Sequence, residues 1–352
     1  MSRVLAVAPV LATHAYAQAE ITAAIAPLLT ADTARRATLE RLHAACGVHT
    51  RHLALPLGDY PGLTSFGQAN DAFVRVGTDL AEQALRRALA DADLRPRDVD
   101  FLLFTSVTGV SAPSLDALVA ERVGLRPDVR RLPSFGLGCA GGAGGLARVH
   151  DYLLGHPQHV AVLLSVELCS LTIQHGDDSM ANLVASGLFG DAAAAVVLVG
   201  SQHPRAGAGG GPEVVDTASR LYPGTSADLG WAVGASGFRI VLAPGLPDAV
   251  GDTLNDDVTA LLDPHEVKVR DVTAWVIHPG GPRILDSVRD ALGLDADALA
   301  ASRRVLAAAG NLSSASVLHV LSEHPDHPSG AWGVVAAFGP GVGAEFVLLR
   351  WG

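Results

Sequence analysis

The sequence predicts an α/β protein made of two related halves, residues 1–200 and 214–352, with βαβ-type units around mixed sheets. Three observations support this prediction. Apolar runs typical of strands alternate with amphipathic helix patterns, several motifs recur in the same order in both halves, and a Gly-rich segment, GSQHPRAGAGGGPE, separates the halves. The chain has 352 residues, of which 49% are hydrophobic, and this is enough for a large buried core.

The first predicted element is a strand from Val4 to Ala8, followed by a loop into a helix. The same stretch, MSRVLAVAPVLATHAYAQAEI, also has an arginine, an apolar run and small residues, as a secretory signal peptide does. Because Pro9 and His14 interrupt the apolar run, we expect a strand and a cytoplasmic protein. No stretch reaches the ~18 uncharged apolar residues of a membrane span.

A duplicated pattern defines the middle of each half. Residues 97–125, RDVDFLLFTSVTGVSAPSLDALVAERVGL, and residues 270–294, RDVTAWVIHPGGPRILDSVRDALGL, share Arg-Asp-Val, a strand-like run, a Gly/Pro turn, a helix pattern and a closing Gly-Leu. Further pairs follow in the same order, namely 130–142 with 303–315, 153–159 with 321–327, and 188–199 with 337–349. Their common order indicates two halves related by a pseudo-twofold axis, which brings equivalent turns together.

The segment PSFGLGCAGGAGGL, residues 133–146, has two interpretations. It matches the fingerprint G-x-G-x-x-G, which would make the protein a dinucleotide-dependent oxidoreductase. However, Pro133 and Ser134 interrupt the strand that should precede the glycines. The acidic residue available for the ribose, Glu167, lies 26 residues beyond Gly141 rather than about 20.

The same segment also places Cys139 at the start of a helix, where unpaired N–H groups and the helix dipole stabilise an anion. A free cysteine with a pKa of ~8.5 is only about 3% ionised at pH 7, and this placement beside an imidazolium lowers the pKa to ~6. We therefore expect Cys139 to be a nucleophile with a lowered pKa. Three cysteines without CxxC spacing favour reduced thiols and argue against a disulfide framework or a zinc site.

The second half supplies the partners of this nucleophile. The turn carrying Asn311, GNLSSAS, should face the Cys139 turn, and His278, in VIHPGG, should lie close by. Taken singly, His278 would suit a structural hydrogen bond and Asn311 a helix N-cap. Together with Cys139 they suit acyl transfer, which needs a nucleophile, a base and two donors to a developing oxyanion.

The motifs GLGCAGG, LFGDAAAA, HPGGPRILD, GNLSSAS and FGPGVGAE resemble those of the type III polyketide synthases, the chalcone-synthase-like branch of the thiolase fold. The resemblance covers about residues 33–352, with Ala337 where a glycine is usual. It implies a thiolase fold with buried central helices in αβαβα layers, a homodimer, and CoA thioesters without a further cofactor. It also implies that Cys139 holds an acyl-CoA starter, while His278 and Asn311 bind malonyl-CoA and stabilise its enolate.

The resemblance extends to the substrate cavity and the CoA site. Phe189 matches the gatekeeper aromatic, and the second gatekeeper is replaced by Ile240 unless Phe238 takes its place. The other implied cavity residues are Thr108, Glu167, Cys169, Thr172, Trp231 and Ser313. In the family, basic residues of one helix bind the CoA phosphates, and this chain has fewer of these residues. Arg41 matches one of them, and the candidates to compensate for the lost lysines are Arg35, Arg36 and Arg51.

Within the family, SVTGVSAPSLDA, SVELCSLT and GWAVGASGFRIVL look most like bacterial alkylresorcinol and alkylpyrone synthases. They look less like plant chalcone synthases or naphthalene-forming enzymes. The resemblance thus implies a medium or long fatty acyl-CoA starter, extended with malonyl-CoA and cyclised to an alkylpyrone or alkylresorcinol. Trp231 argues against this, because an indole that fills the pocket would favour a short starter.

Two further alternatives stay open at this point. A fatty-acid-type ketoacyl synthase would extend its substrate once from a carrier protein and needs a basic docking face, which the sequence does not show. A non-catalytic homologue is disfavoured because Cys139, His278 and Asn311 are all present. A net charge of −11 without a basic run argues against nucleic acid and anionic membranes as partners.

Overall fold

The computed structural model describes residues 1–207, 211–243, 245–324 and 327–352. Over this part of the chain, a mixed sheet has the strand order β11-β12-β13-β8-β1-β7-β6-β4-β5. Its strands are β1 (Ser2–Leu11), β4 (Phe101–Thr105), β5 (Arg130–Ser134), β6 (Val160–Leu168), β7 (Asp191–Gly200), β8 (Glu213–Leu221), β11 (Val272–Ile277), β12 (Trp332–Gly339) and β13 (Gly343–Arg350). Two short sheets stand apart, formed by β2 (His14–Ala17) with β3 (Thr50–Leu53) and by β9 (Leu229–Gly234) with β10 (Gly237–Leu242).

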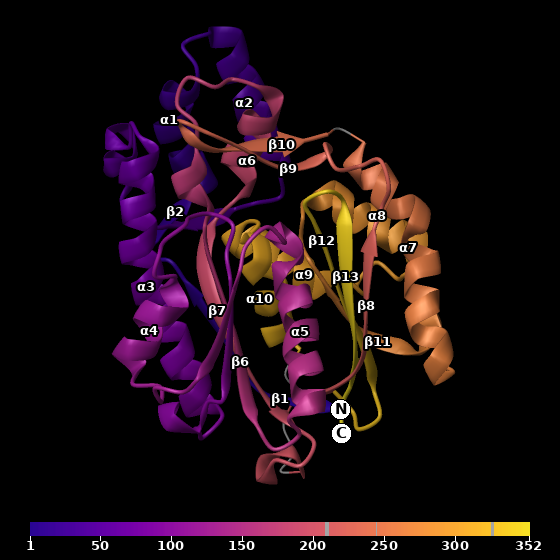
Figure 1. Cartoon of the computed structure of the whole chain (residues 1–352). Helices are drawn as coiled ribbons and strands as arrows, with labels where there is room; N and C mark the ends of the chain where they lie inside the picture. The colour runs from indigo at the N-terminus through magenta and orange to yellow at the C-terminus, as the bar shows by residue number, and fades with distance from the viewer. Residues whose placement is uncertain (208–210, 244, 325–326) are drawn as a thin grey trace.

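The large sheet divides between β1 and β8. These strands pair only at Ser2 with Val214 and at Arg3 with Glu213, whereas β1 pairs with β7 along its length. One sub-sheet therefore comes from the first half of the chain and the other from the second half (Figure 1). Each contains parallel and antiparallel pairs, as the sequence predicts.

Helices form three layers around these two sub-sheets. Between them lie α5 (Gly141–Gly155) and α10 (Ser316–Ser322), which contact strands of both. Outside one sub-sheet lie α3 (Phe66–Asp91) and α4 (Leu115–Val123), and outside the other lie α7 (Leu246–Leu262) and α8 (Pro282–Leu292) (Figure 1). The remaining helices are α1 (Gln18–Leu29), α2 (Thr33–Ala45), α6 (Met180–Leu188) and α9 (Ala300–Ala309). The expected αβαβα layering is therefore present.

The glycines of α5 let this central helix approach its neighbours closely. A Cβ at Gly142 would lie 2.3 Å from the carbonyl oxygen of Ser314, and one at Gly145 would lie 2.4 Å from Leu163 in β6. These faces are therefore occupied by protein, and no room is left along them for a pyrophosphate. The expectation that Pro133 prevents a preceding strand was wrong, because β5 includes it at the edge of the sheet, where proline is tolerated.

Equivalent segments of the two halves have similar structures. Each Arg-Asp-Val stretch overlaps a 3-10 turn, Pro96–Asp98 or Val269–Asp271, and leads into a strand and then a helix. The helices α4 and α8 both end at a left-handed glycine, Gly124 with φ 80° and Gly293 with φ 60°. The local structure thus follows the duplicated sequence pattern.

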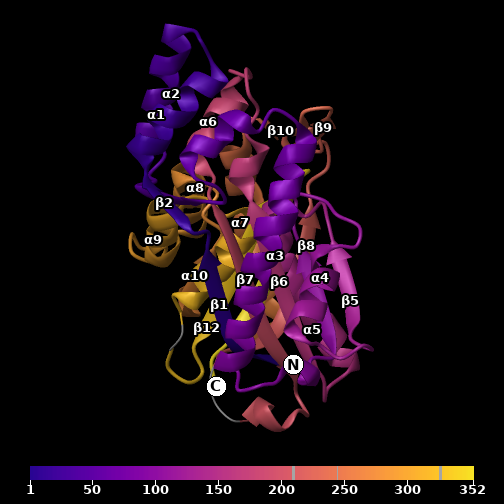
Figure 2. The same ribbon diagram turned by 90° about the vertical axis from the view of Figure 1, so that its left-hand side faces the viewer.

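The N-terminal segment forms a strand, as predicted, but a longer one. β1 extends from Ser2 to Leu11 and includes Pro9. The far end of the molecule gathers α1, α2, α6 and the β9–β10 hairpin, while both chain termini lie at the opposite end (Figures 1 and 2). Within the described residues, no helix combines the length and the apolar character needed to cross a membrane.

Candidate active site

Cys139 lies in the 3-10 turn Gly138–Ala140, which leads directly into α5. This turn packs against β12, where a Cβ at Gly339 would lie 2.8 Å from that of Ala140. The Cys139 thiol donates to Oγ of Ser313 at 3.7 Å, and both residues line a small internal hollow. The cysteine is thus at the start of a helix, as predicted, and faces the turn that carries Asn311.

Asn311 has its side chain fixed by its own turn. Its Oδ1 accepts the backbone N–H of Ser313 at 2.8 Å and the hydroxyl of Ser316 at 3.3 Å. Because the oxygen is engaged there, the amide NH2 is left to donate toward Cys139, where its hydrogen bond favours the thiolate. The same NH2 is available to a substrate oxygen in this hollow.

His278 directly follows β11 and is 2% exposed. Its backbone N–H donates to the carbonyl of Ala336 at 2.9 Å, so the residue lies beside β12, against which the Cys139 turn packs. The ring Nδ1 is buried and has no hydrogen-bond partner in the described part of the chain. An unpaired buried nitrogen of this kind is available to accept a proton or to bind a substrate.

Burial determines the charge states of Cys139 and His278. It raises the pKa of the Cys139 thiol to about 12, assisted by the charge of Glu167, and it lowers the pKa of His278 to about 3. The expectation of a lowered cysteine pKa was therefore wrong, because desolvation outweighs the helix start. Each group alone is neutral at pH 7. We expect the thiolate to form together with the imidazolium of His278, since a buried ion pair would stabilise both charges at once.

Glu167 lies behind the site and not on the cavity wall, which corrects its assignment, whereas the assignment of Thr108 stays a prediction. The Glu167 side chain is fully buried, and its carboxylate accepts bonds from one backbone N–H and four hydroxyls. The donors are Val107, Ser106, Thr108, Ser313 and Ser314. Burial raises the pKa of Glu167 while these bonds oppose the rise. This network fixes the hydroxyl that receives the Cys139 thiol.

The hollow beside Cys139 is small, with a volume of about 40 Å³. A second hollow of about 20 Å³ lies on the other side of the same wall. Trp231 and Ile240, which are paired across the β9–β10 hairpin, line both. The other predicted cavity residues found there are Phe189, Cys169, Thr172 and Ser313. The indole therefore occupies the space beside the nucleophile.

An aromatic cluster that the sequence analysis did not identify holds Trp231 in place. The ring of Phe238 lies 6.1 Å from Trp231, 5.3 Å from Phe66 and 6.1 Å from Phe135, measured between centroids. Phe238 is 4% exposed. It thus supports the hairpin from behind and does not replace the missing gatekeeper. In the sequence, the only indication of this role of Phe238 is that it lies two residues before Ile240.

The arginines considered for CoA binding fall into two groups. Arg35 and Arg41 are exposed on α2, and Arg36 is partly exposed with its Nε donating to the carbonyl of Thr30 at 3.1 Å. Arg51 is different, because it is 1% exposed and lies inside the protein. It cannot reach the phosphates of CoA, so its assignment to that role was wrong.

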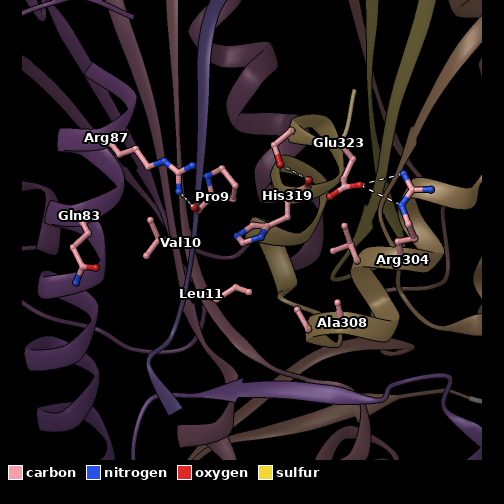
Figure 3. A pocket seen from close by; sticks show the side chains of 12 residues that line it. Pro9, Val10, Leu11, Gln83, Arg87, Arg304, Ala308, His319 and Glu323 are labelled. Carbon is pink, nitrogen blue, oxygen red and sulfur yellow. Dashed lines mark hydrogen bonds and ion pairs between the residues drawn. The ribbon is translucent and has the colours of Figure 1, made fainter. Parts of the chain in front are cut away.

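A larger cavity, of about 720 Å³, lies elsewhere, between α3, β1, α9 and α10 (Figure 3). Arg87 and Arg304 stand on its two sides, and His319 lies at its base (Figure 3). Arg304 is paired with Glu323 at 3.1 Å, so this charge is already compensated. No cysteine is among its lining residues, and the hydroxyl of Ser322, which is among them, donates to the carbonyl of His319 at 2.7 Å. Size alone therefore does not locate the active site.

Comparison with family models identifies both parts of the chain. Residues 2–203 match the model described as chalcone and stilbene synthases, N-terminal domain, and residues 213–351 match the corresponding C-terminal domain. The crystal structure of 1,3,6,8-tetrahydroxynaphthalene synthase from Streptomyces coelicolor A3(2), a type III polyketide synthase, superposes with a TM-score of 0.92 at 30% identity and covers 99% of both chains. The expected thiolase-type fold is confirmed by this likeness.

Two relatives indicate which members of the family this chain resembles more closely. The 1,3,6,8-tetrahydroxynaphthalene synthase of Streptomyces peucetius subsp. caesius is 56% identical over 99% of this chain and 93% of its own. The alpha-pyrone synthesis polyketide synthase-like Pks18 of Mycobacterium tuberculosis is 32% identical over 79% of this chain and 71% of its own. The expectation that the chain resembles naphthalene-forming enzymes less than pyrone-forming ones was therefore wrong.

The coupled charge states predict how Cys139 reacts. Substitution His278→Ala should slow the alkylation of Cys139 by iodoacetamide at pH 7 at least tenfold, because no base then accepts the thiol proton. Alkylation should recover as the pH rises toward the pKa of the isolated thiol. Peptide mapping by mass spectrometry measures the rate, with Cys46 as the internal control. Equal rates at Cys139 in the variant and the wild type would show that the two groups are not coupled.

Proposed function

Because the chain belongs to the chalcone and stilbene synthase family, and is therefore a type III polyketide synthase and an acyltransferase, we propose that it builds a short-starter polyketide from malonyl-CoA alone. The product class we assign is that of 1,3,6,8-tetrahydroxynaphthalene, the compound named for the relative that is 56% identical. Membership of this family argues against both the dinucleotide-dependent oxidoreductase and the single-step ketoacyl synthase.

The observation that carries this proposal is the position of Trp231. Its indole borders the hollow of about 40 Å³ beside Cys139, which is far smaller than the ~300–1,000 Å³ of pockets that hold a drug-sized ligand. An acyl group of two or three carbons on the sulfur fits such a space, whereas a long alkyl chain does not. The growing chain needs more room. The β9–β10 hairpin is the element to supply it, since it is paired with no other strand of the described chain.

In the loading step the Cys139 sulfur attacks the thioester carbonyl of the starter CoA. The thiol proton passes to His278, and it then protonates the CoA sulfur as that bond breaks. Asn311 donates its amide N–H to the oxyanion of the tetrahedral intermediate. Ser313, held by Glu167, receives the thiol hydrogen bond in the resting enzyme and so orients the sulfur.

In the extension step the carbonyl oxygen of malonyl-CoA lies between His278 and Asn311. Loss of carbon dioxide leaves its electron pair in the enolate, whose oxygen the two residues stabilise as charge develops. The enolate carbon then attacks the Cys139 thioester, a carbon–carbon bond forms, and the sulfur departs as thiolate. Desolvation strengthens both donors, because His278 and Asn311 are each 2% exposed.

A fatty acyl-CoA starter with an alkylpyrone or alkylresorcinol product is the second candidate. The feature that favours it is Ile240, which stands where the family has an aromatic gatekeeper. In either case the CoA phosphates would lie against Arg35, Arg36 and Arg41 of α2. These arginines form no ion pair with a carboxylate in the described part of the chain and are free to hold an anion.

The edge strand β5 supports the proposal of a homodimer. It pairs only with β4 among the described strands, which leaves its outer backbone groups open. Large apolar side chains are exposed on and near it, namely Leu132 (46%), Phe135 (54%) and Val110 (44%). A second copy of the chain would cover these side chains and pair with this edge.

Two substitutions separate the proposed role of the nucleophile from that of the oxyanion donors. Cys139→Ala should abolish starter loading but leave decarboxylation of malonyl-CoA measurable, because His278 and Asn311 are intact. Asn311→Ala should lower decarboxylation by about 10²-fold, the usual effect of losing one oxyanion donor. Radiolabelled starter on the protein and released carbon dioxide are the two measurements. Simultaneous loss of both activities in Cys139→Ala, with the fold retained, would contradict these roles.

We expect Trp231 to limit the chain length of the acyl-CoA starter. With malonyl-CoA fixed, kcat/KM across acyl-CoAs from two to sixteen carbons should be highest for the shortest. Trp231→Gly should raise the value for six to twelve carbons, by about fourfold for each additional methylene that becomes buried. Trp231→Phe is the matched control and should keep the short preference. A wild-type maximum at twelve or more carbons would favour the fatty acyl candidate instead.

The exposed edge predicts a dimer that one charge can break. Light scattering should give twice the chain mass at micromolar concentration, and Leu132→Asp should shift it toward the monomer because an unpaired carboxylate would be buried. Leu221→Asp is the control, since Leu221 is 82% exposed on a different strand and should leave the dimer intact. A monomeric wild type would rule out this interface.

A further inference from the structure

Arg51, in β3, is a buried arginine directly behind the active site. Its Nε donates to Oε1 of Gln18 at 2.9 Å, and its Nη1 donates to the carbonyl oxygen of Phe189 at 2.8 Å. Its Nη2 is buried and has no hydrogen-bond partner within the described residues. The aliphatic stem packs at Gly310, where a Cβ would lie 3.3 Å from Cγ and Cδ. The side chain therefore touches both segments that meet at the site.

The hydrogen bond to Phe189 continues through one peptide group to Asn311. The carbonyl of Phe189 accepts from Arg51, and the N–H of the same peptide group, on Gly190, donates to the carbonyl of Asn311 at 3.0 Å. The N–H of Asn311 in turn donates to the carbonyl of Leu188 at 2.8 Å. The backbone of Asn311 is thus held on both sides by the segment that Arg51 anchors. A charged donor at one end polarises each bond of such a chain.

The charge of Arg51 has no direct counterion. Among the described residues, no carboxylate lies within ion-pair distance of its guanidinium, and its neighbour Asp191 is occupied by Ala54 and Ser170. Burial lowers the pKa of Arg51 to about 10, so the group stays charged at neutral pH. The charge of Asp191 raises the pKa of Arg51 from beyond ion-pair distance, so the cation is compensated only in part. A buried charge held in this way costs folding free energy, which is consistent with a role beyond stability.

From this geometry we infer that Arg51 is a positioning residue for the decarboxylation step, which holds the Asn311 amide in place through the peptide group between Phe189 and Gly190. The inference rests on the proposed role of Asn311. It assigns to Arg51 no contact with substrate. Losing its bonds would let the Asn311 backbone shift against the enolate oxygen, and a small displacement of an oxyanion donor lowers the rate without weakening substrate binding.

The test is Arg51→Met, which keeps the buried stem and removes the charge and the donors. We expect kcat for decarboxylation of malonyl-CoA to fall at least tenfold with KM within twofold, and alkylation of Cys139 to stay within twofold. A purely structural role would instead lower all three in proportion to the folded fraction. The matched control is Arg3→Met. Arg3 is also largely buried, donates to the carbonyl of Gly211 and has an unpaired Nε, but it is paired with Glu213 at 2.7 Å and lies in β1, next to the N-terminus.

Each outcome decides the inference. A folded Arg51→Met with kcat within twofold of wild type overturns it, as does an equal fall in Arg3→Met. If Arg51→Met does not fold, Arg51→Lys decides, with an expected three- to tenfold fall, because one ammonium replaces a guanidinium anchored on two sides. Decarboxylation that survives Asn311→Ala would overturn the proposed function itself. A loss in Asn311→Ala without one in the Arg51 variants would overturn the inference alone.

Discussion

The close contact between the glycine face of α5 and the turn at 313–315 determines where every group of the site lies. With the carbonyl of Ser314 in the place that a Cβ of Gly142 would need, the helix that begins after Cys139 meets the turn that carries Asn311. Any larger residue there would separate the two halves of the site by the width of a side chain. The glycines that resemble a nucleotide loop in the sequence therefore serve to join the two halves.

A second consequence of this packing is a layer of buried polar groups beneath the cavity. Glu167 lies under Cys139 and Ser313 with its oxygens occupied, and Arg51 lies under Phe189 and Asn311 with one nitrogen free. Both side chains hold residues that are proposed to face the substrate, and neither side chain is proposed to touch the substrate itself. Such groups cost folding free energy but fix directions, and a reaction that depends on the angle of a hydrogen bond to a developing enolate needs fixed directions.

The restricted space beside Cys139 connects this site to its relatives. We assign to Cys139, His278 and Asn311 the chemistry shared across the family, and we propose that the Trp231–Ile240 wall selects the acyl group that they receive. That wall stands on a hairpin outside the main sheet and is supported by Phe238. The proposed short starter therefore depends on an element that lies outside the main sheet.

The sequence by itself determined the duplicated α/β architecture and the family, and it predicted the three positions that we propose for catalysis, because these depend on periodicity and on short motifs of local geometry. Three other properties were decided only by the tertiary structure. Arg51 and Arg41 look alike along the chain, yet one is buried and the other exposed. The pKa of Cys139 rises because burial outweighs the helix start. The proposal of a short starter rests on where the indole of Trp231 lies. Desolvation and free volume arise from residues distant in sequence, so local patterns do not contain them.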